Sequence, residues 1–259
     1  MVHSWDPVPY LKYAGERGRP FLELLTRVGA DGPRTVVDLG CGPGNMTRVL
    51  AERWPLAEVL GLDSSVPMIE AARVAAPGVR FEVADVATWT PAEPVDVLFS
   101  HATLQWIPGH LDLLPQLVAA VAPGGWFAFG VPGNFDQPSH TLRTALTAEP
   151  PYAAQTAGVA SPDAHDAATY LEVLTGLGCE VDAWETTYLH QLDATADPDP
   201  VFTWISATGA RPVLEALDDT LRPAYEAELK RRLREAYPER DGRVLLPFRR
   251  VFVVAQILG

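Results

Sequence analysis

Cysteine is scarce in this sequence, and long apolar runs are missing from it. The 259 residues include two cysteines, Cys41 and Cys179, which give neither a disulfide framework nor the spacing of a metal site. No run approaches the roughly 18 apolar residues of a transmembrane helix. The first residues, MVHSWDPVPY, lack the cationic start and apolar stretch of a secretory signal. These absences predict a cytoplasmic protein with no bound metal.

Basic residues are also few. Lys and Arg number 20 against 33 Asp and Glu, so the formal net charge is −13. An acidic chain is repelled by nucleic acid and by anionic membrane surfaces. Hydrophobic residues make up 47% and charged residues 20%, which is the balance of a globular protein with a buried core. The composition therefore argues against nucleic-acid and membrane partners, and it leaves the oligomeric state open.

Short apolar runs alternate with helical patterns over the first half of the chain. Strands are predicted at 35–40, 58–63, 79–85, 95–100 and 125–132, and helices at 20–29, 45–54, 65–74 and 111–121. Strands that alternate with helices form a parallel sheet with helices on both faces. The pattern predicts an α/β fold with a doubly wound, Rossmann-like sheet.

The pattern changes after Pro132. We expect a mobile loop at 150–167, a helix at 168–177, strands at 179–192 and 249–258, and helices within 197–237. The sheet should then have about seven strands, mostly parallel, with an antiparallel last strand. A single domain over 1–259 is expected, with an N-terminal helical lid at 1–30 and a helical cap insert at 193–245.

The stretch VVDLGCGPGN, residues 36–45, joins a predicted strand to a helix through three glycines. A tight turn that only packs the helix on the strand is one interpretation, and a ligand loop is the other. A dinucleotide loop would read G-x-G-x-x-G, whereas this one reads G-x-G-x-G and follows Asp38. A carboxylate beside a pyrophosphate is unfavourable and a carboxylate beside an ammonium group is favourable. The ligand should therefore carry a cation.

Two further acids end the next predicted strands. Asp63 stands where a carboxylate binds a ribose diol in such folds, and Asp85 ends the third strand, within reach of an adenine amino group. Ribose, adenine and a cationic amino-acid tail together describe S-adenosylmethionine, which we expect as the cofactor.

The motifs DLGCGPGN, LDSS and AD resemble those of class I S-adenosylmethionine-dependent methyltransferases. The flanking blocks are more specific and resemble the trans-aconitate methyltransferase family along nearly the whole chain. They are WDPVPYLKYAGERGRPFLELL, ADVATWTP, LQWIPGH, WETTYLHQL, ATGARPVLEAL and LLPFRRVFVVA. The resemblance implies methyl esterification of a small polycarboxylic acid of the trans-aconitate type, with release of S-adenosylhomocysteine.

The predicted cofactor site combines these motifs with the carboxyl edge of the fourth strand. Its residues are Asp38, Gly40, Gly42, Gly44, Asn45, Asp63, Ser64, Met68, Asp85, Val86, His101, Gln105 and Trp106. For Met68 a place in the core is an equal alternative.

The chain departs from the family pattern at three places. It has His101 where relatives usually have Asn, and Gly130 where they usually have Gln. Between Arg143 and Arg211 it has no Lys or Arg, although relatives often carry a basic residue there. The small Gly130 is expected to leave room for acids bulkier than trans-aconitate.

Carboxyl methylation needs no catalytic base, because a carboxylate is already ionised at neutral pH. We therefore predict no catalytic residue and look for cations and hydrogen-bond donors. The predicted acceptor site consists of Tyr10, Arg19, Trp106, Trp184, Thr186, Tyr188, His190, Arg211, Arg249 and Arg250. A half-buried strand face and solvated arginines are the alternative interpretations. His110 and His165 are expected at the surface.

Two other functions stay open. The same chemistry on a biosynthetic acid or a peptide C-terminal carboxylate is one. The other is a nucleotide-binding regulatory protein that keeps the glycine loop without catalysis. Calorimetry with S-adenosylhomocysteine followed by a turnover assay separates the last from the enzymes.

Overall fold

The computed structural model describes residues 14–259, so Tyr10 lies outside the described residues. Contacts between α-carbons divide the chain into two compact units. Unit 1 holds the described residues up to Pro132, together with Ala164–Thr186 and Arg250–Gly259, and unit 2 holds Gly133–Asp163 and Thr187–Arg249. Each unit contains segments that are distant in the sequence.

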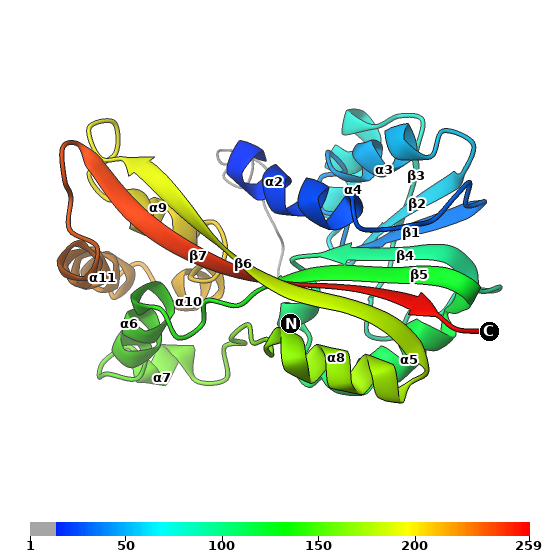
Figure 1. Ribbon diagram of the computed structural model, residues 1–259. Coiled ribbons are helices and arrows are strands. Elements are labelled where there is room, and N and C mark those ends of the chain that lie inside the picture. The colour runs from blue at the N-terminus through cyan, green and yellow to red at the C-terminus, as the bar shows by residue number, and fades with distance from the viewer. Residues whose placement is uncertain (1–13) are drawn as a thin grey trace. The chain divides into compact units, whose positions relative to one another are not determined.

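A seven-stranded sheet organises unit 1 (Figure 1). Its strands are β1 (Thr35–Leu39), β2 (Glu58–Asp63), β3 (Arg80–Val83), β4 (Val95–His101), β5 (Val121–Pro132), β6 (Cys179–Asp193) and β7 (Arg243–Ile257). Their order is β3-β2-β1-β4-β5-β7-β6. The first five strands pair in parallel, and β7 pairs antiparallel with β5. The predicted doubly wound sheet is confirmed.

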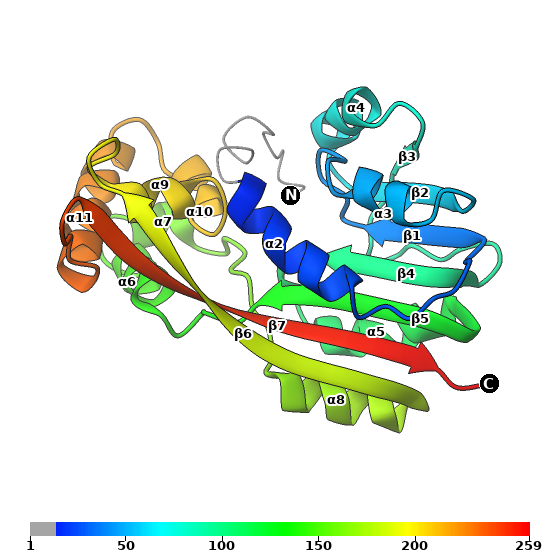
Figure 2. The same cartoon turned by 45° about the horizontal axis from the view of Figure 1, so that its top comes forward.

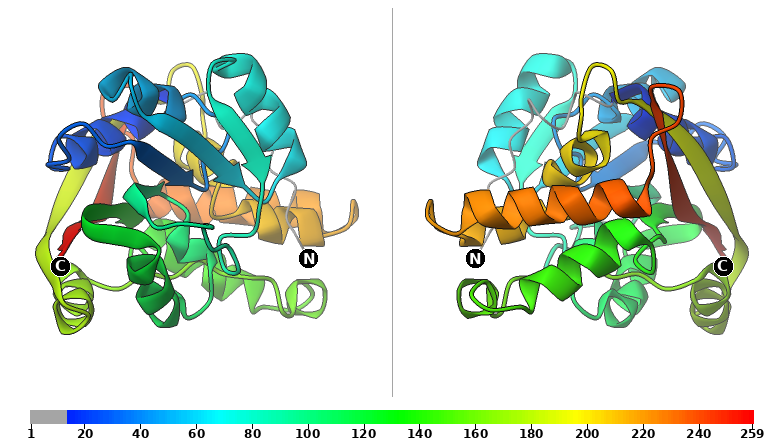
Figure 3. Two further views of the ribbon diagram at one scale, coloured as in Figure 1. Left: turned by 90° about the vertical axis from the view of Figure 1, so that its right-hand side faces the viewer. Right: turned by 90° about the vertical axis from the view of Figure 1, so that its left-hand side faces the viewer.

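Helices cover both faces of this sheet (Figures 2 and 3). On one face lie α2 (Ala14–Leu25), α3 (Thr47–Arg53) and α4 (Val66–Ala75), and on the other lie α5 (Leu114–Ala119) and α8 (Ala167–Gly176). The 3-10 turns η1 (Leu104–Trp106) and η2 (His110–Leu113) follow β4. Leu117 of α5 and Leu174 of α8 pack in one buried cluster with Leu98 and Phe129 of the sheet. Burial of such side chains provides most of the stabilisation of this layer.

Element boundaries differ from the prediction where backbone pairing overrides local pattern. β7 begins at Arg243 rather than near residue 249, so Arg249 and Arg250 lie within the strand and do not open it. The predicted helix at 111–121 splits into η2 and α5, with Pro115 in the first turn of α5, where a missing N–H costs nothing. The segment 150–167 contains the short helix α7 (Ala153–Thr156).

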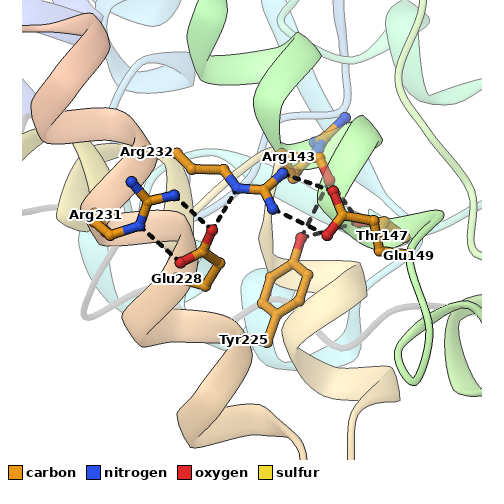
Figure 4. A network of polar contacts seen from close by, with 7 residues as sticks. All are labelled: Arg143, Thr147, Glu149, Tyr225, Glu228, Arg231 and Arg232. Atoms are coloured by element: carbon orange, nitrogen blue, oxygen red, sulfur yellow. Dashed lines mark hydrogen bonds and ion pairs between the residues drawn. The ribbon is translucent and has the colours of Figure 1, made fainter.

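Unit 2 is built around two helices, α6 (Pro138–Thr147) and α11 (Arg222–Ala236), with α7, α9 (Pro200–Ser206) and α10 (Arg211–Ala216). A polar network joins α11 to α6 and the turn after it (Figure 4). Arg232 binds both oxygens of Glu149, at 2.8 and 2.9 Å, and also Glu228. The Thr147 and Tyr225 hydroxyls lie 2.9 Å apart. Within residues 14–259, no helix is long and apolar enough to cross a membrane.

Candidate functional site

The glycine loop connects β1 to α3 in unit 1 and needs glycine for two physical reasons. The φ values are 76° at Gly40, 53° at Gly42 and 75° at Gly44. They lie in the left-handed region, which is unfavourable for residues that have a β-carbon. A β-carbon on Gly40 would lie 2.0 Å from Thr103 Oγ1, and one on Gly44 would lie 2.7 Å from the β-carbon of Ala72. The loop is thus held close to neighbouring elements.

The backbone N–H groups of this loop already have acceptors. Those of Gly40 and Cys41 donate to the Leu62 carbonyl, at 2.7 and 2.9 Å. The N–H of Gly44 donates to the Cys41 carbonyl, and that of Gly42 to Asp63 Oδ2 at 3.0 Å. Residue 43 is proline and has no N–H. The loop therefore has no amide left within residues 40–44 to bind a phosphate, in contrast to a dinucleotide loop.

Asp38 is the second-last residue of β1, just before the loop, and is 2% exposed. Its Oδ2 accepts a hydrogen bond of 2.7 Å from the Thr47 hydroxyl. Burial raises the pKa of Asp38 from 3.8 to about 7, and the charge of Asp63 adds to the rise, while the Thr47 bond opposes it. An ionised carboxylate in this place gains strongly from a nearby cation.

Asp63 ends β2 and is half-buried. Its two oxygens accept from the N–H groups of Gly42, at 3.0 Å, and Ser65, at 2.9 Å. Burial raises the pKa of Asp63, and the two backbone bonds oppose the rise. Two carboxylates at adjacent strand ends, both with raised pKa values, make an anionic site suited to a cationic ligand.

The remaining predicted cofactor residues follow the carboxyl ends of the strands. Asp85 is exposed and accepts the Ala87 N–H at 2.9 Å, whereas Met68 and Val86 are buried. Gln105 is buried, and its Nε2 donates to the Ala102 carbonyl at 2.6 Å. The others range from exposed Ser64 to half-buried Asn45 and Trp106. The burial of Met68 agrees with its alternative interpretation as a core residue.

Sequence reasoning missed two hydroxyl residues at this site. Thr47 of α3 binds Asp38, and Thr103 lies against Gly40, donating to its carbonyl at 3.3 Å. Thr47 stands nine positions after Asp38, and Thr103 follows a different strand. Neither spacing carries a known sequence signal, so only the fold reveals them.

His101 fills the space beside Gly130. A β-carbon on Gly130 would lie 2.9 Å from His101 Cδ2 and 3.2 Å from Phe252 Cδ1. The expectation that Gly130 leaves room for bulkier acids is therefore wrong, because the larger side chain at 101 occupies that room. Burial, together with the charge of Arg250, lowers the pKa of His101 well below its usual value. The ring stays neutral, and its Nε2 has no hydrogen-bond partner among the described residues.

We expect Gly130→Ala to lower the free energy of unfolding by about 1–3 kcal/mol, the usual cost of overpacking. In a His101→Asn background the same change should cost clearly less, because the ring that meets the new methyl group is gone. Urea unfolding of the double-mutant cycle measures this coupling. Gly176→Ala is the control, since no atom of the described residues lies within 4 Å of a β-carbon there. If Gly130→Ala lowers the free energy of unfolding equally in both backgrounds, residue 130 does not pack against the His101 ring.

The predicted acceptor residues of unit 1 have different surroundings. The Trp184 ring stacks on Phe252 with centroids 5.1 Å apart. Thr186 is half-buried and Arg250 is buried. Arg19 is exposed on α2, where it pairs with Glu23 at 2.7 Å. Of these two arginines, Arg250 is the buried one.

In unit 2, the predicted aromatic residues of β6 form a cluster. His190 stacks with Tyr188 at 6.2 Å and lies 4.7 Å from the Trp204 ring, between centroids. The predicted alternation holds, because every second residue from Trp184 to His190 is less exposed than the residues between them. Arg211 pairs with Glu215 at 2.6 Å, and Arg249 is half-buried.

The placement of His110 at the surface was wrong. His110 is 2% exposed, and its Nε2 lies 2.6 Å from the Tyr170 hydroxyl. His165 is half-buried beside it, with ring centroids 5.5 Å apart. A hydrogen bond from a residue 60 positions away explains why local sequence did not reveal this burial.

Comparisons with known proteins agree with this geometry. A family model described as a methyltransferase domain matches residues 36–125. Among solved structures, the YcgJ protein from Bacillus subtilis has a TM-score of 0.60 at 10% identity, covering 93% of this chain and 99% of that one. A phosphoethanolamine N-methyltransferase from Haemonchus contortus has a TM-score of 0.56 at 18% identity, covering 93% and 53%. These likenesses show the fold.

Curated relatives are much closer in sequence. A trans-aconitate 2-methyltransferase from Streptomyces avermitilis is 50% identical over 264 residues, covering 98% of this chain and 97% of that protein. One from Methylobacterium nodulans is 48% identical over 256 residues, covering 98% of each. At this identity over nearly the full length, the chain belongs to the trans-aconitate 2-methyltransferase family.

Proposed function

We propose that the protein transfers the methyl group of S-adenosylmethionine to a carboxylate oxygen of trans-aconitate. The observation that carries the proposal is the loop between β1 and α3. Its backbone N–H groups already donate to acceptors within the protein, and the loop lies beside the carboxylates of Asp38 and Asp63. Such a site favours a cofactor with cationic groups and a ribose diol over a pyrophosphate. The acceptor is taken from the names of the relatives.

The residues present fit this cofactor in three places. The cationic amino-acid end would lie toward Asp38, the ribose hydroxyls would bind Asp63, and the adenine would lie near Asp85. When bound, the cofactor supplies a methyl group already activated by the positive sulfur. The protein's tasks are to align the acceptor oxygen, methyl carbon and sulfur and to exclude water. Alignment of this kind contributes about 7–11 kcal/mol in favourable model reactions.

No base is required, because the acceptor is an anion at neutral pH. His101 agrees with this, since a buried neutral imidazole with a strongly lowered pKa does not take up a proton near pH 7. A cytoplasmic setting is part of the proposal. Its support is that both cysteines, Cys41 and Cys179, are buried free thiols.

An acceptor screen tests the proposal. The protein is incubated with S-adenosylmethionine and, separately, trans-aconitate, cis-aconitate, citrate and tricarballylate, and products are analysed by mass spectrometry. We expect a singly methylated product, highest with trans-aconitate. Turnover of a different acid alone would mean that this acid, and not trans-aconitate, is the substrate. Binding of S-adenosylhomocysteine without turnover of any acid would favour the regulatory alternative.

Cofactor affinity should depend on pH through Asp38. Burial raises its pKa to about 7, so below that pH the free protein carries a proton that a cationic ligand must expel. Binding of S-adenosylhomocysteine, which keeps the ammonium group, should therefore strengthen by about tenfold from pH 6 to pH 7.5 and then level off. Calorimetry at several pH values measures this, and Asp38→Asn should bind more weakly with a flat profile. A wild-type affinity that is constant across this range would remove Asp38 from the ligand's surroundings.

A further inference from the structure

Arg143 is a buried cation within unit 2. It lies on α6 and is 4% exposed. Its Nη1 donates to the Gly209 carbonyl, and its Nη2 donates to the Ser161 hydroxyl at 3.2 Å. Both acceptors are neutral. A guanidinium has more N–H donors than these two contacts use, and it keeps its charge in proteins.

No carboxylate among residues 14–259 forms an ion pair with Arg143. The two acids drawn in Figure 4 have other partners, since Glu149 binds Arg232 and Glu228 binds Arg231 and Arg232. A buried charge without a counter-charge is costly. In a chain of net charge −13, a cation left without an acid indicates that an anion comes from outside.

Two more polar side chains of unit 2 are buried without partners among the described residues. His140, one turn before Arg143 on α6, is 9% exposed, and its Nδ1 has no hydrogen-bond partner there. Asn134 is 1% exposed, and neither end of its amide has a partner among the described residues. Buried polar atoms are nearly always paired in native proteins, so each of these needs an explanation.

His140 is neutral in this setting. Burial lowers its pKa to about 3, and the charge of Arg143 adds to the fall, while exposed Asp136 opposes it. A neutral imidazole can donate one hydrogen bond without adding a second buried charge. One cation with neutral donors beside it suits a carboxylate.

Gly209 places Arg143 and His140 around one point. A β-carbon there would lie 3.0 Å from Arg143 Nη1 and 3.3 Å from His140 Cε1. The two side chains therefore converge on a stretch of backbone that carries no side chain. A larger residue at 209 would push against both groups, so the convergence depends on glycine.

We propose that Arg143, assisted by His140, forms a site within unit 2 that binds a carboxylate of a small organic acid. The identity of the acid rests on the proposed function, but the anion-binding role stands on the buried cation itself. A carboxylate that enters this site is buried there, so its charge must be paired. The arginine fork matches both oxygens of a carboxylate, which lysine does not do.

A purely structural role for Arg143 is the competing interpretation, in which it only ties α6 to Gly209 and Ser161. The two roles separate in acceptor binding measured without turnover. Calorimetry titrates trans-aconitate, tricarballylate and citrate into the protein saturated with S-adenosylhomocysteine, where no methyl group can be transferred. Arg143→Met, Arg143→Lys and Gly209→Ala are compared with Arg232→Met, which removes an arginine of the same unit that already has Glu149 and Glu228 as partners.

We expect Arg143→Met to weaken the binding of at least one acid by about tenfold or more, the scale of a lost charged hydrogen-bond pair. Arg143→Lys should recover little and Gly209→Ala should weaken binding to a smaller extent. Affinity for S-adenosylhomocysteine should stay within about twofold in all variants, and Arg232→Met should bind acid normally even if it is less stable. If Arg143→Met does not fold, Arg143→Lys and Gly209→Ala decide the matter.

Acid affinities unchanged in the folded Arg143 variants, or no acid binding to the wild type, would overturn the inference. Acid binding that depends on Arg143 without methylation of any acid would refute the proposed function and retain this site. Methylation of trans-aconitate by folded Arg143 variants that bind acids as tightly as the wild type would retain the proposed function and refute this site.

Discussion

Gly40→Ala is expected to lower the free energy of unfolding by about 2–5 kcal/mol. The left-handed conformation at residue 40 costs an alanine about 1–2 kcal/mol, and its φ is 76°. The new methyl group would also lie 2.0 Å from Thr103 Oγ1 and 2.4 Å from Thr103 Cγ2. Because this overlap forces the loop or the turn after β4 to move, an overpacking cost of about 1–3 kcal/mol is added.

Gly124→Ala separates the two contributions. Gly124 has a similar φ of 78°, but within residues 14–259 no atom lies within 4 Å of its added β-carbon. It should therefore show only the conformational cost of about 1–2 kcal/mol. Adding Thr103→Ala to Gly40→Ala should restore part of the lost stability, because it removes the atoms that overlap. Urea unfolding in which Gly40→Ala and Gly124→Ala lose equal stability would contradict the close approach of the loop to Thr103.

Asp63→Ala is expected to weaken S-adenosylhomocysteine binding by about 1–3 kcal/mol, which corresponds to roughly 5- to 150-fold. The ribose hydroxyls would lose their charged acceptor. The loop would also lose its bond from the Gly42 N–H to Asp63, which lies at 3.0 Å. Calorimetry on the folded variant measures the affinity, and circular dichroism verifies the fold.

Asp96→Ala is a matched control for this change. Asp96 also accepts two backbone N–H groups, those of Arg34 at 2.7 Å and Thr35 at 3.0 Å. It stands at the start of β4, however, where the opposite ends of the parallel strands lie. We expect it to lose stability and to keep cofactor affinity. Wild-type affinity in Asp63→Ala would exclude this carboxylate from the cofactor site.

The parts of the fold that the sequence predicts are those set by local pattern. β2 was predicted at its observed bounds because an apolar run ends in an acid, and the glycine loop was predicted from its spacing. α6 was not predicted, because its buried face is completed by α11, about 80 residues later in the chain. The early start of β7 likewise depends on backbone pairing and not on composition.

The candidate site divides in the same way. Asp38 and Asp63 follow from motif position, whereas Thr47 and Thr103 come from separate elements that only the fold brings to the loop. Arg143 was passed over because its isolation is a tertiary property. A sequence shows that an arginine is present, but it does not show which arginine the acids of the same unit bind. Charge pairing inside a fold is therefore the part that sequence reasoning could not supply.

The most direct measurement is the position of the transferred methyl group. The protein is given S-adenosylmethionine carrying a ¹³C-labelled methyl group together with trans-aconitate, and the product is examined by long-range carbon–proton NMR correlation. We predict one labelled methyl group coupled to a carboxyl carbon, released as methanol by mild alkali, with the His101→Asn protein forming the same ester. A label on carbon, or no transfer to trans-aconitate by a protein that binds the cofactor, would contradict carboxyl methylation of this acid.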